Sequence, residues 1–578
     1  MIAKVRKAST PNSNVDVTTT QIMLAFAGLF LLNLLLRVFY IRFDFVNGDE
    51  GVRALTAVRM LEGARLYADV VTDKPPGASL FYAAVFAMFG RSMKAVHLAA
   101  IVWNFATSVV VYATGSRFYN KRIGLWASVL FVYFSTNYFT QDTMAANTEL
   151  LMALPYTAAF YFFMASHVAA KKASVDATPA RAALLAAGWL TGLATLFKQI
   201  GVLNLAFFAI YEILSAWKAE RGLGGFVRRS VTRLSPIAVG FGVVLAVVAV
   251  WLKSMHTLGD FWRNGFVLNM FYIDSEPANL WVKFMLGRGL GFIFFNTTLW
   301  VLAGWAVWRP LIRVRERTND VSDESDLAIA LWCGVSLVAV MISGRFYGHY
   351  FIPALPALSL LAARGVQLLR GSLSDSNHRL RARIGLAALA VLFVVGLLRC
   401  HHRTAVLAYE TVTGARTRWS ANWGMNRREQ VAEIVSEYVR ERISPGEPLY
   451  IWGYAHDVYW RTGCRPASRY LVPYYIDGRF ADAEATVPSS GEALRAEAAA
   501  NLLEDLRRTK PRLILDVEGN FLALPYPELL DFVNANYVED GNAGPEASRP
   551  FRVLRLKTED ERQREEIERQ RKKERRRQ

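Results

Sequence analysis

Residues 21–41 read QIMLAFAGLFLLNLLLRVFYI, an apolar stretch long enough to cross about 30 Å of hydrocarbon as a helix. Ten similar blocks follow along the chain, at about 95–115, 123–139, 148–168, 182–197, 201–216, 235–252, 289–308, 327–343, 351–369 and 384–399. The sequence therefore predicts a polytopic α-helical membrane protein with about eleven spanning helices.

The overall composition agrees with this interpretation. Of the 578 residues, 53% are hydrophobic and 20% are charged, and the mean hydropathy is +0.20. Soluble chains average about 45–50% apolar and about 25% charged residues, so a soluble enzyme, a disordered scaffold and a disulfide-rich secreted module are excluded. The net charge of +18 is spread over short segments between the apolar blocks. It lacks the basic face with interleaved aromatics that is typical of nucleic-acid binding.

Residues 78–90, ASLFYAAVFAMFG, are apolar but too short to cross, at about 20 Å as a helix. We therefore predict an interfacial or re-entrant helix in the first outer loop. This choice decides the topology, because cytoplasmic loops are enriched in lysine and arginine. With the N-terminal segment 1–20 in the cytoplasm, the inner segments hold 22 lysines and arginines in 88 residues, against 13 in 106 for the outer segments. Counting 78–90 as a span would invert every later loop.

The composition changes beyond residue 400, so the transmembrane domain is expected at 21–400. Strand-like runs at 448–454, 512–517 and 551–557 alternate with helical patterns, which predicts a small extracytoplasmic α/β domain over 401–558. The charged tail, 559–578, holds nine basic and seven acidic residues, as is typical of a solvated helix or a disordered segment. Cys400 and Cys464 could form a bridge or remain free thiols, and no Cys–His spacing indicates zinc.

The first outer loop contains an acidic pair and a lysine in conspicuous positions. Asp49 and Glu50 precede a helical pattern at 51–63. Asp49 could cap this helix and Glu50 favour its positive N-terminus, or a carboxylate at the membrane surface could act as a general base; both can hold together. Lys74 lies in DKPPG (73–77), where the prolines stiffen the corner. It either snorkels to the headgroup boundary or binds a lipid phosphate.

Further polar residues fall in the other outer segments: Asp142, Glu149, Lys198, Arg345 and His349. The acids could cap helices and the lysine could snorkel. Tyr347 and Tyr350 could belong to an interfacial aromatic belt, while Arg345 and His349, four residues apart, could both reach a phosphate or sugar. Their common position on one side of the membrane indicates a shared site instead.

The first loop resembles that of the C-type glycosyltransferase (GT-C) superfamily. The resemblance rests on Asp49-Glu50 after the first span, LEGARLYAD at 61–69 and Lys-Pro-Pro at 74–76, in that order. The similarity is greatest to bacterial relatives of dolichyl-phosphate-mannose–protein mannosyltransferases and of the aminoarabinose transferase that modifies lipid A, and it covers about residues 21–400. It implies a multi-pass protein of the bacterial plasma (inner) membrane, whose active site lies outside the cytoplasm.

The resemblance also implies roles for the outer residues. Asp49 would be the catalytic carboxylate, with Glu50 beside it. The donor phosphate would be bound by Lys74, joined by Lys198, Arg345 and His349. The acceptor or donor site would be shaped by Asp142 and Glu149.

Together these observations predict an inverting glycosyltransferase, hexosyl or pentosyl, that uses a polyprenyl-phosphate-linked sugar on the non-cytoplasmic face. A lipid-linked donor is expected because nucleotide sugars are not available there and no Gly-rich phosphate loop is present in the sequence. A single displacement inverts the anomeric centre. The acceptor is a glycan, lipid or protein, and membrane lipid is the remaining partner. No metal or other cofactor is required by this chemistry, although a divalent ion is compatible with it.

Two other classes of function remain open at this point. A transporter or flippase of lipid-linked glycans would typically show repeated halves and ionisable groups near the membrane midplane. A non-catalytic subunit of glycan assembly would use the C-terminal domain for protein binding.

Overall fold

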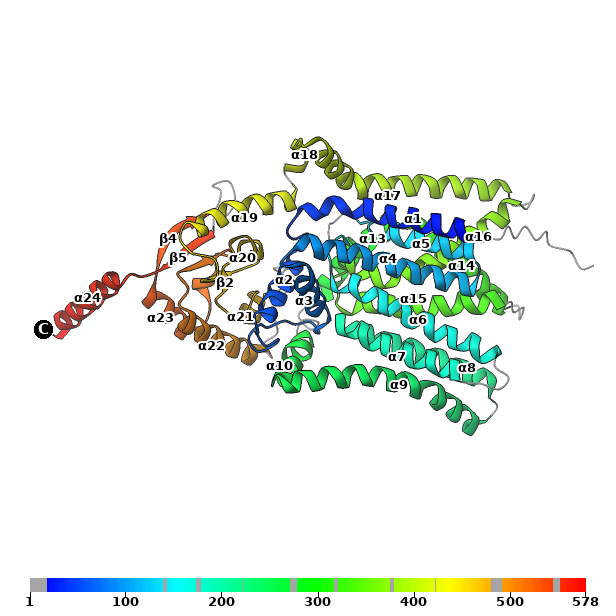
Figure 1. Cartoon of the computed structure of the whole chain (residues 1–578), viewed down its shortest axis with the longest axis horizontal. Helices are drawn as coiled ribbons and strands as arrows, with labels where there is room; N and C mark the ends of the chain where they lie inside the picture. Colours follow the sequence, from blue (N-terminus) through cyan, green and yellow to red (C-terminus); the bar gives the residue numbers. More distant parts are fainter. Residues whose placement is uncertain are drawn as a thin grey trace, which may run out of the picture.

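The computed structural model describes residues 18–138, 143–172, 178–220, 222–270, 278–315, 321–374, 379–421, 423–479, 491–543 and 551–577. Figure 1 shows an array of long helices, a compact mixed region at one end of that array, and a last helix that projects away from it. The helices of the array and its connections are α1 (Thr19–Arg37), α2 (Gly48–Leu61), α3 (Gly77–Phe89), α4 (Met93–Phe118), α5 (Lys121–Phe134), α6 (Thr148–Lys172), α7 (Thr178–Phe197), α8 (Leu203–Ala219), α9 (Leu223–Ser254), α10 (Leu258–Trp262), α12 (Ala278–Phe284), α13 (Leu290–Phe295), α14 (Thr297–Arg315), α15 (Val321–Ile342), α16 (Leu355–Ser374) and α17 (Arg379–Thr413). Short 3-10 or π-helical turns join them: η1 (Val38–Arg42), η3 (Gln199–Val202), η4 (Arg263–Val267), η5 (Met285–Gly289) and η6 (Gly348–Ala354).

Nine helical segments in the described ranges are long and apolar enough to cross a membrane. The number is ten if the segments Leu280–Phe295 and Thr297–Trp308, which meet at 80°, count as one broken span. The prediction of a polytopic helical membrane protein is thus confirmed, with two differences. The predicted span 289–308 is not one straight helix, because the chain bends by 80° between Phe295 and Thr297. The predicted span 123–139 is only the 14-residue helix α5, because the hydroxyls of Ser135 and Thr136 donate to Val132 O and Tyr133 O and satisfy the carbonyls of its last turn.

The apolar stretch after Lys-Pro-Pro forms a short helix, as expected. Helix α3 has 13 residues, begins directly after Pro76, and ends at Gly90, whose φ of 74° breaks the helix. It does not reach the length of a span.

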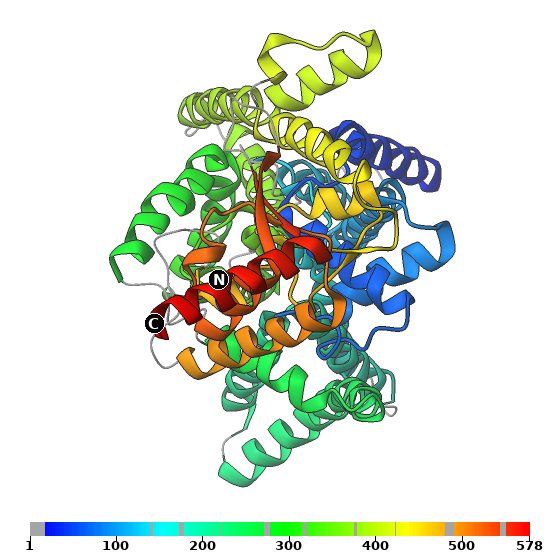
Figure 2. The ribbon, with the colours of Figure 1, turned by 90° about the vertical axis from the view of Figure 1, so that its left-hand side faces the viewer.

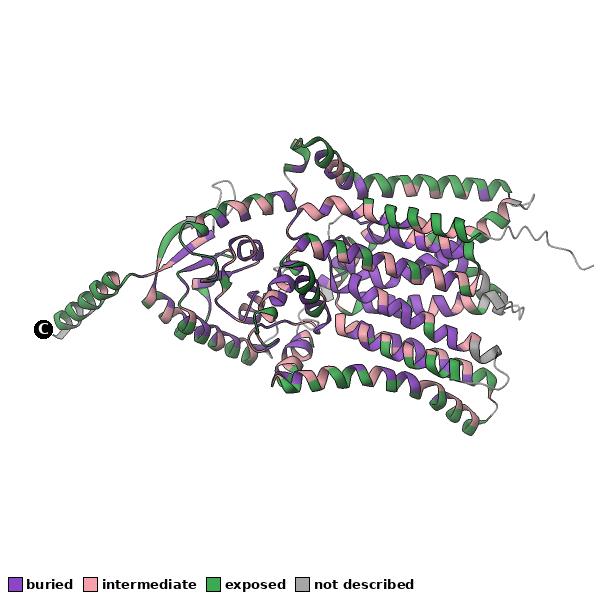
Figure 3. Ribbon diagram, in the orientation of Figure 1, coloured by how far each residue is buried: buried purple, intermediate pink, exposed green. Residues whose placement is uncertain are grey.

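Burial separates inner from outer helices. In α6 and in the η6–α16 segment, 72% of the apolar window is buried, against 17% in α1 and in α17. Figure 3 shows the exposed faces of α1, α9 and α17 on the outside of the array. In the interior, Trp332 of α15 stacks on Phe160 of α6 with ring centroids 4.1 Å apart. The outer helices thus offer apolar faces to lipid around a packed centre.

The C-terminal region is a small α/β unit built on one five-stranded sheet. Its strand order is β2-β1-β3-β5-β4, with β1 parallel to β2 and β3, and the remaining pairs antiparallel. Its elements are α18 (Arg418–Ala421), α19 (Gly424–Arg440), β1 (Pro448–Trp452), α20 (His456–Thr462), β2 (Arg465–Pro466), α21 (Tyr474–Asp477), α22 (Glu492–Thr509), β3 (Leu513–Asp516), η8 (Phe521–Ala523), α23 (Pro527–Asn536), β4 (Tyr537–Ala543), β5 (Phe551–Leu556) and α24 (Glu559–Arg577).

The three predicted strands are confirmed as β1, β3 and β5, and the charged tail is the helix α24. The short edge strand β2 and the polar strand β4 escaped prediction. All three cysteines, Cys333, Cys400 and Cys464, are buried free thiols.

The C-terminal region packs against the first outer loop. Helix α2 contacts α20 at Gly51, where an added Cβ would lie 2.5 Å from His456 Cβ. Only glycine permits so close an approach. Figure 2, which views the molecule from that side, shows the C-terminal region in front of the helix ends.

Candidate active site

The acidic pair lies in the first turn of α2. Asn47 is the N-cap, because its side chain accepts a hydrogen bond from Glu50 N at 3.1 Å. The expectation that Asp49 caps the helix is therefore wrong: α2 begins one residue before Asp49. The Asp49 side chain does not cap the helix; it is 55% exposed and accepts a 3.0 Å hydrogen bond from Arg53, one helical turn later.

Glu50 points the other way and is completely buried. Its carboxylate accepts hydrogen bonds from Val46 N at 2.6 Å and Ala146 N at 2.7 Å, and it contacts His97 Nε2 at 3.1 Å. Burial alone would raise the pKa of Glu50. The charge and the hydrogen bond of His97, together with the hydrogen bonds from the amides of Ala146 and Val46, instead hold this pKa below its ordinary value. Glu50 thus joins the first loop, the second loop and α4.

Asp49 faces a cavity of about 260 Å³ at the end of the helix array beside the C-terminal region. Six of the residues predicted for the site line this cavity: Asp49, Lys74, Glu149, Lys198, Arg345 and His349. Glu50 is not part of the lining, and Asp142 lies outside the described residues. Side chains spread over 300 residues of sequence are therefore brought to one place.

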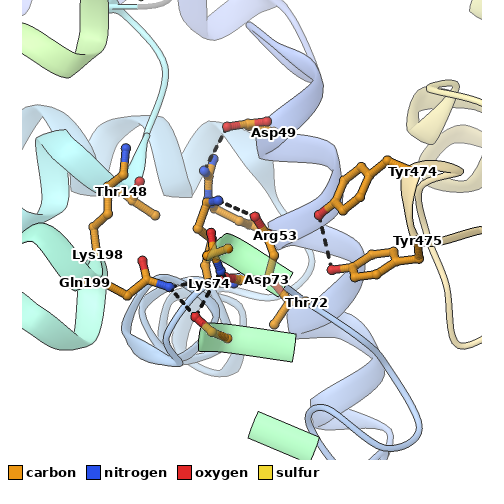
Figure 4. A network of polar contacts seen from close by, with 12 residues as sticks. Asp49, Arg53, Thr72, Asp73, Lys74, Thr148, Lys198, Gln199, Tyr474 and Tyr475 are labelled. Carbon is orange, nitrogen blue, oxygen red and sulfur yellow. Dashed lines mark hydrogen bonds and ion pairs between the residues drawn. The ribbon is translucent and has the colours of Figure 1, made fainter. Parts of the chain in front are cut away.

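The Lys74 corner is held from several sides. Lys74 pairs with Asp73, and Tyr67 Oη donates to Lys74 O at 2.9 Å. The amides of Gln199 and Asn269 donate to Asp73 O at 3.3 and 2.6 Å. Figure 4 shows this network beside Asp49 and Arg53. Tyr67 itself has a φ of 75°, a left-handed conformation that costs about 1–3 kcal/mol in a non-glycine residue.

The turn between α7 and α8 brings Lys198 close to this corner. A Cβ at Gly77 would lie 2.6 Å from Leu196 O, so the start of α3 rests directly on the end of α7. Lys198 Nζ pairs with Glu149 and lies 3.8 Å from the centre of the Tyr350 ring. The Glu149 carboxylate also accepts a 2.8 Å hydrogen bond from the neighbouring Thr148 hydroxyl.

The segment between α15 and η6 contributes Arg345 and His349. The Arg345 side chain is buried, and its carbonyl accepts a 3.2 Å hydrogen bond from Arg288. His349 stacks with Tyr347 and lies 3.8 Å from Glu149 through its Nε2. His349 thus lies beside the Lys198–Glu149 pair, and Arg345 lines the same cavity.

Sequence reasoning missed several residues of the lining. Arg53 could have been found, since a base four residues after an acid in a helix is a standard pairing distance. The aromatic side chains of Tyr454 and Tyr474, with Val472, come from the C-terminal region. No local pattern marks these three as part of a site, because their partners lie about 400 residues earlier.

The electrostatics of the cavity favour an anionic ligand. Its lining carries four arginines and lysines against three carboxylates, together with His349. Burial alone would raise the pKa of Asp49, but the charges of Arg53, His349 and Lys74 hold it below its ordinary value. Asp49 is therefore an ionised carboxylate at neutral pH. No group of three or more acidic, histidine or cysteine side chains suited to a metal occurs in the described parts of the chain.

The fold can be compared with solved structures. ArnT from Cupriavidus metallidurans in the apo state matches over 93% of this chain and 98% of its own, with a TM-score of 0.56 and 14% identity. Its structure bound to undecaprenyl phosphate matches over the same shares with a TM-score of 0.53 and 13% identity. This chain has the GT-C fold.

Two further comparisons concern a family profile and another solved structure. Residues 73–252 match the profile of the family described as dolichyl-phosphate-mannose-protein mannosyltransferase. The Archaeoglobus fulgidus oligosaccharyltransferase tethered with an acceptor peptide matches 92% of this chain and 74% of its own at 12% identity and a TM-score of 0.49. A search of the curated proteins returns no match. The profile match and the ArnT-like fold thus confirm the predicted resemblance to GT-C proteins.

Proposed function

We propose that this protein is an inverting glycosyltransferase of the bacterial plasma membrane, which moves a hexosyl or pentosyl group from a polyprenyl-phosphate donor to an acceptor on the non-cytoplasmic face. The observation that carries the proposal is the single cavity in which the ionised Asp49 faces Lys74, Lys198 and Arg345. The GT-C fold, and the structural likeness to ArnT bound to undecaprenyl phosphate, support a lipid-linked donor.

In the proposed reaction the donor phosphate lies among Lys74, Lys198, Arg345 and His349. An acceptor hydroxyl or amine attacks the anomeric carbon from the side opposite the phosphate, and the bond from that carbon to the phosphate oxygen breaks. The cations stabilise the charge that develops on the departing phosphate. One displacement inverts the anomeric centre.

Asp49 takes the proton of the acceptor. Arg53 holds one of its carboxylate oxygens, Oδ2, and so orients the group toward the cavity. A base with a lowered pKa is weak. Proton transfer is therefore expected late, when bond formation has already made the attacking atom acidic.

The neighbouring carboxylates take supporting roles in this proposal. Glu50, predicted as part of the catalytic pair, is better suited to positioning: its buried carboxylate fixes the start of α2 and hence the place of Asp49. Glu149 orients Lys198 and His349, while Asp142 is retained as an acceptor-site residue of the second outer loop. The protein's own cations neutralise the phosphate, so no metal is assigned to this step.

A transporter is less well supported. Ionisable groups buried within the helix array would have to carry the transported molecule, yet Glu212 pairs with Arg233 at 2.7 Å and Asp326 with Arg364 at 3.3 Å. These groups serve as structural ion pairs, whereas the exposed carboxylate Asp49 lies at the end of the array.

The test is a transfer assay with purified protein in detergent or nanodiscs. Defined undecaprenyl-phosphate-linked hexoses and pentoses are supplied with a lipid, glycan and peptide acceptor panel, and products are identified by mass spectrometry. Sugar transfer with inverted configuration by the native protein, absent in D49N, is the expected result. Movement of the lipid-linked sugar between the two leaflets of reconstituted vesicles, without sugar transfer, would overturn the proposal in favour of a flippase.

A further inference from the structure

The C-terminal region contributes two tyrosine rings to the cavity that holds Asp49. Tyr454 follows strand β1, and Tyr474 begins α21 after strand β2. Because β1 and β2 are parallel, both segments leave the same edge of the sheet, the usual position of ligands in such sheets. Both rings are half-buried and the remainder of each is open to the cavity.

This aromatic wall is held rigidly. Trp452 Nε1 donates to Asn520 at 2.6 Å, and His456 contacts Leu471 O at 2.9 Å, which ties together the segments that follow β1 and β2. His456 also packs on Gly51 of α2, the helix that carries Asp49. The tyrosines are therefore pre-organised relative to the Asp49 carboxylate, as a specific site requires.

The two rings differ in how their hydroxyls are used. Tyr474 Oη is bonded to Tyr475 Oη at 3.2 Å. The Tyr454 hydroxyl makes no hydrogen bond to any residue that the structure describes. Burial, and then the nearby charges of Asp49 and other carboxylates, raise the pKa of Tyr454 well above its ordinary value, so the group remains a neutral donor facing the cavity.

The opposite wall of the cavity has a different character. Lys198 and Thr148 lie on one side of Asp73–Lys74 in Figure 4, and Tyr474 with Tyr475 on the other. Lys198 and the two tyrosines of the C-terminal region therefore lie on different sides of the cavity, whereas Tyr347 and Tyr350, the other tyrosines of the lining, lie beside His349 and Lys198. A sugar phosphate has two parts: a charged leaving group, and a ring with an apolar face and peripheral hydroxyls.

We propose that Tyr454 and Tyr474 form the subsite for the transferred sugar: their rings pack against the sugar ring, and the Tyr454 hydroxyl donates to one of its hydroxyls. The inference rests on the proposed function and names the class of sugar. The subsite takes a hexose or pentose ring, because the apolar face of such a ring suits the two tyrosine rings that line the cavity and its hydroxyls suit the Tyr454 hydroxyl. The C-terminal region thereby selects the donor.

The experiment compares donors in the full-length protein. kcat/KM is measured for two undecaprenyl-phosphate sugars that are epimers at one hydroxyl, with the native protein, Y454F, Y454A and Y474F. Y438F is the matched control, since Tyr438 is a half-buried tyrosine of the same region, outside the cavity lining, bonded to Asp540. Donor and acceptor KM are determined separately.

We expect Y454F to lower kcat/KM for the preferred epimer roughly five- to tenfold, the value of one neutral hydrogen bond, with a smaller loss for the other epimer. Y454A should lose more for both epimers, and Y438F should match the native protein. An unchanged epimer ratio in both Tyr454 variants, or a rise confined to acceptor KM, would overturn the inference while leaving the proposed function intact. No transfer from any donor by the native protein would instead refute the proposed function.

Discussion

Adjacent carboxylates do different work in this molecule because the helix turns them in different directions. Asp49 and Glu50 follow one another in sequence, yet one is half-exposed in a cavity and the other has no exposed surface. The sequence could identify the pair, but it could not show that Asp49 faces the cavity while Glu50 is buried. That difference depends on Ala146 and His97, which lie far from the first loop in sequence.

Replacing Asp49 by Asn should remove the general base while keeping the hydrogen-bonding shape of the side chain. We expect the transfer rate to fall by roughly 10²–10⁴-fold. Single-turnover transfer with saturating donor measures the loss, and an unchanged thermal midpoint of the purified variant controls for folding. Activity within twofold of the native protein would refute the assignment of Asp49.

Replacing Glu50 by Gln should reduce stability in a pH-dependent manner. The folded-state pKa of Glu50 is lowered, so the folded protein binds fewer protons and the ionised group stabilises it above the unfolded value of about 4.3. The E50Q variant should therefore have a lower thermal midpoint at pH 7. The difference from the native protein should shrink as the pH falls below about 4.3. A difference that is constant from pH 7 to pH 3.5 would contradict this role.

Replacing Lys74 by Ala should weaken use of the donor. A hydrogen bond to a charged group is worth about 1.5–3 kcal/mol, so kcat/KM for the donor should fall roughly 10- to 100-fold. Lys74→Arg, which keeps the charge, should recover part of the loss. Identical donor dependence in the native protein and in K74A would speak against a phosphate contact.

At the scale of elements, helix α2 forms the contact between the helix array and the C-terminal region. One face of α2 carries Asp49 and Arg53 toward the cavity, and Gly51 contacts His456 of α20. A side chain at position 51 must push these helices apart, and with them Asp49 and the tyrosine wall.

Gly51→Val should therefore lower the free energy of unfolding by about 1–3 kcal/mol through overpacking. It should also reduce transfer, because the cavity walls separate. Thermal unfolding in detergent measures the first effect. Gly28→Ala is the control: nothing lies within 4 Å of an added Cβ there, and its thermal midpoint should stay close to that of the native protein. Equal midpoints for G51V and G28A would show that the contact is not tight.

Helix and strand patterns were readable wherever the local sequence decides the structure. The long apolar blocks and the strands β1, β3 and β5 follow from composition and alternation. Helix α5 is shorter than its apolar block because hydroxyl side chains after Phe134 end it, and β2 is formed by only two residues. These features depend on local hydrogen bonds and edge pairing that hydrophobicity does not register.

At the scale of the whole molecule, the positive charge is an orientation signal, and it predicts that the C-terminal region lies outside the cytoplasm. A reporter inserted at Gly414, just past the end of α17, tests this directly. Alkaline phosphatase fused there should be active in cells and a fluorescent protein exported in unfolded form should stay dark. The reverse pattern would overturn the orientation and, with it, the reason for a lipid-linked donor.

Only part of the candidate site was predictable from the sequence, because its residues are brought together by the fold of the whole molecule. Lys74, Lys198 and Arg345 could be grouped because the charge pattern predicts that all three lie at ends of apolar blocks on one side of the membrane. The tyrosines of the C-terminal region could not, since their approach to Asp49 depends on the docking of a sheet about 400 residues away. Sequence patterns indicate on which side of the membrane a residue lies, whereas only the packed structure shows which residues lie close together.

The division of the cavity between the two ends of the chain has a consequence for biosynthesis. Tyr454, Val472 and Tyr474 emerge from the ribosome only after every spanning helix has been made. A nascent chain whose helices are already inserted thus has Asp49 and Lys74 in place but only one side of the pocket. On the proposed function and orientation, such a chain should not consume lipid-linked sugar until its last third has been translocated and has docked. The order of synthesis would then delay the onset of sugar transfer.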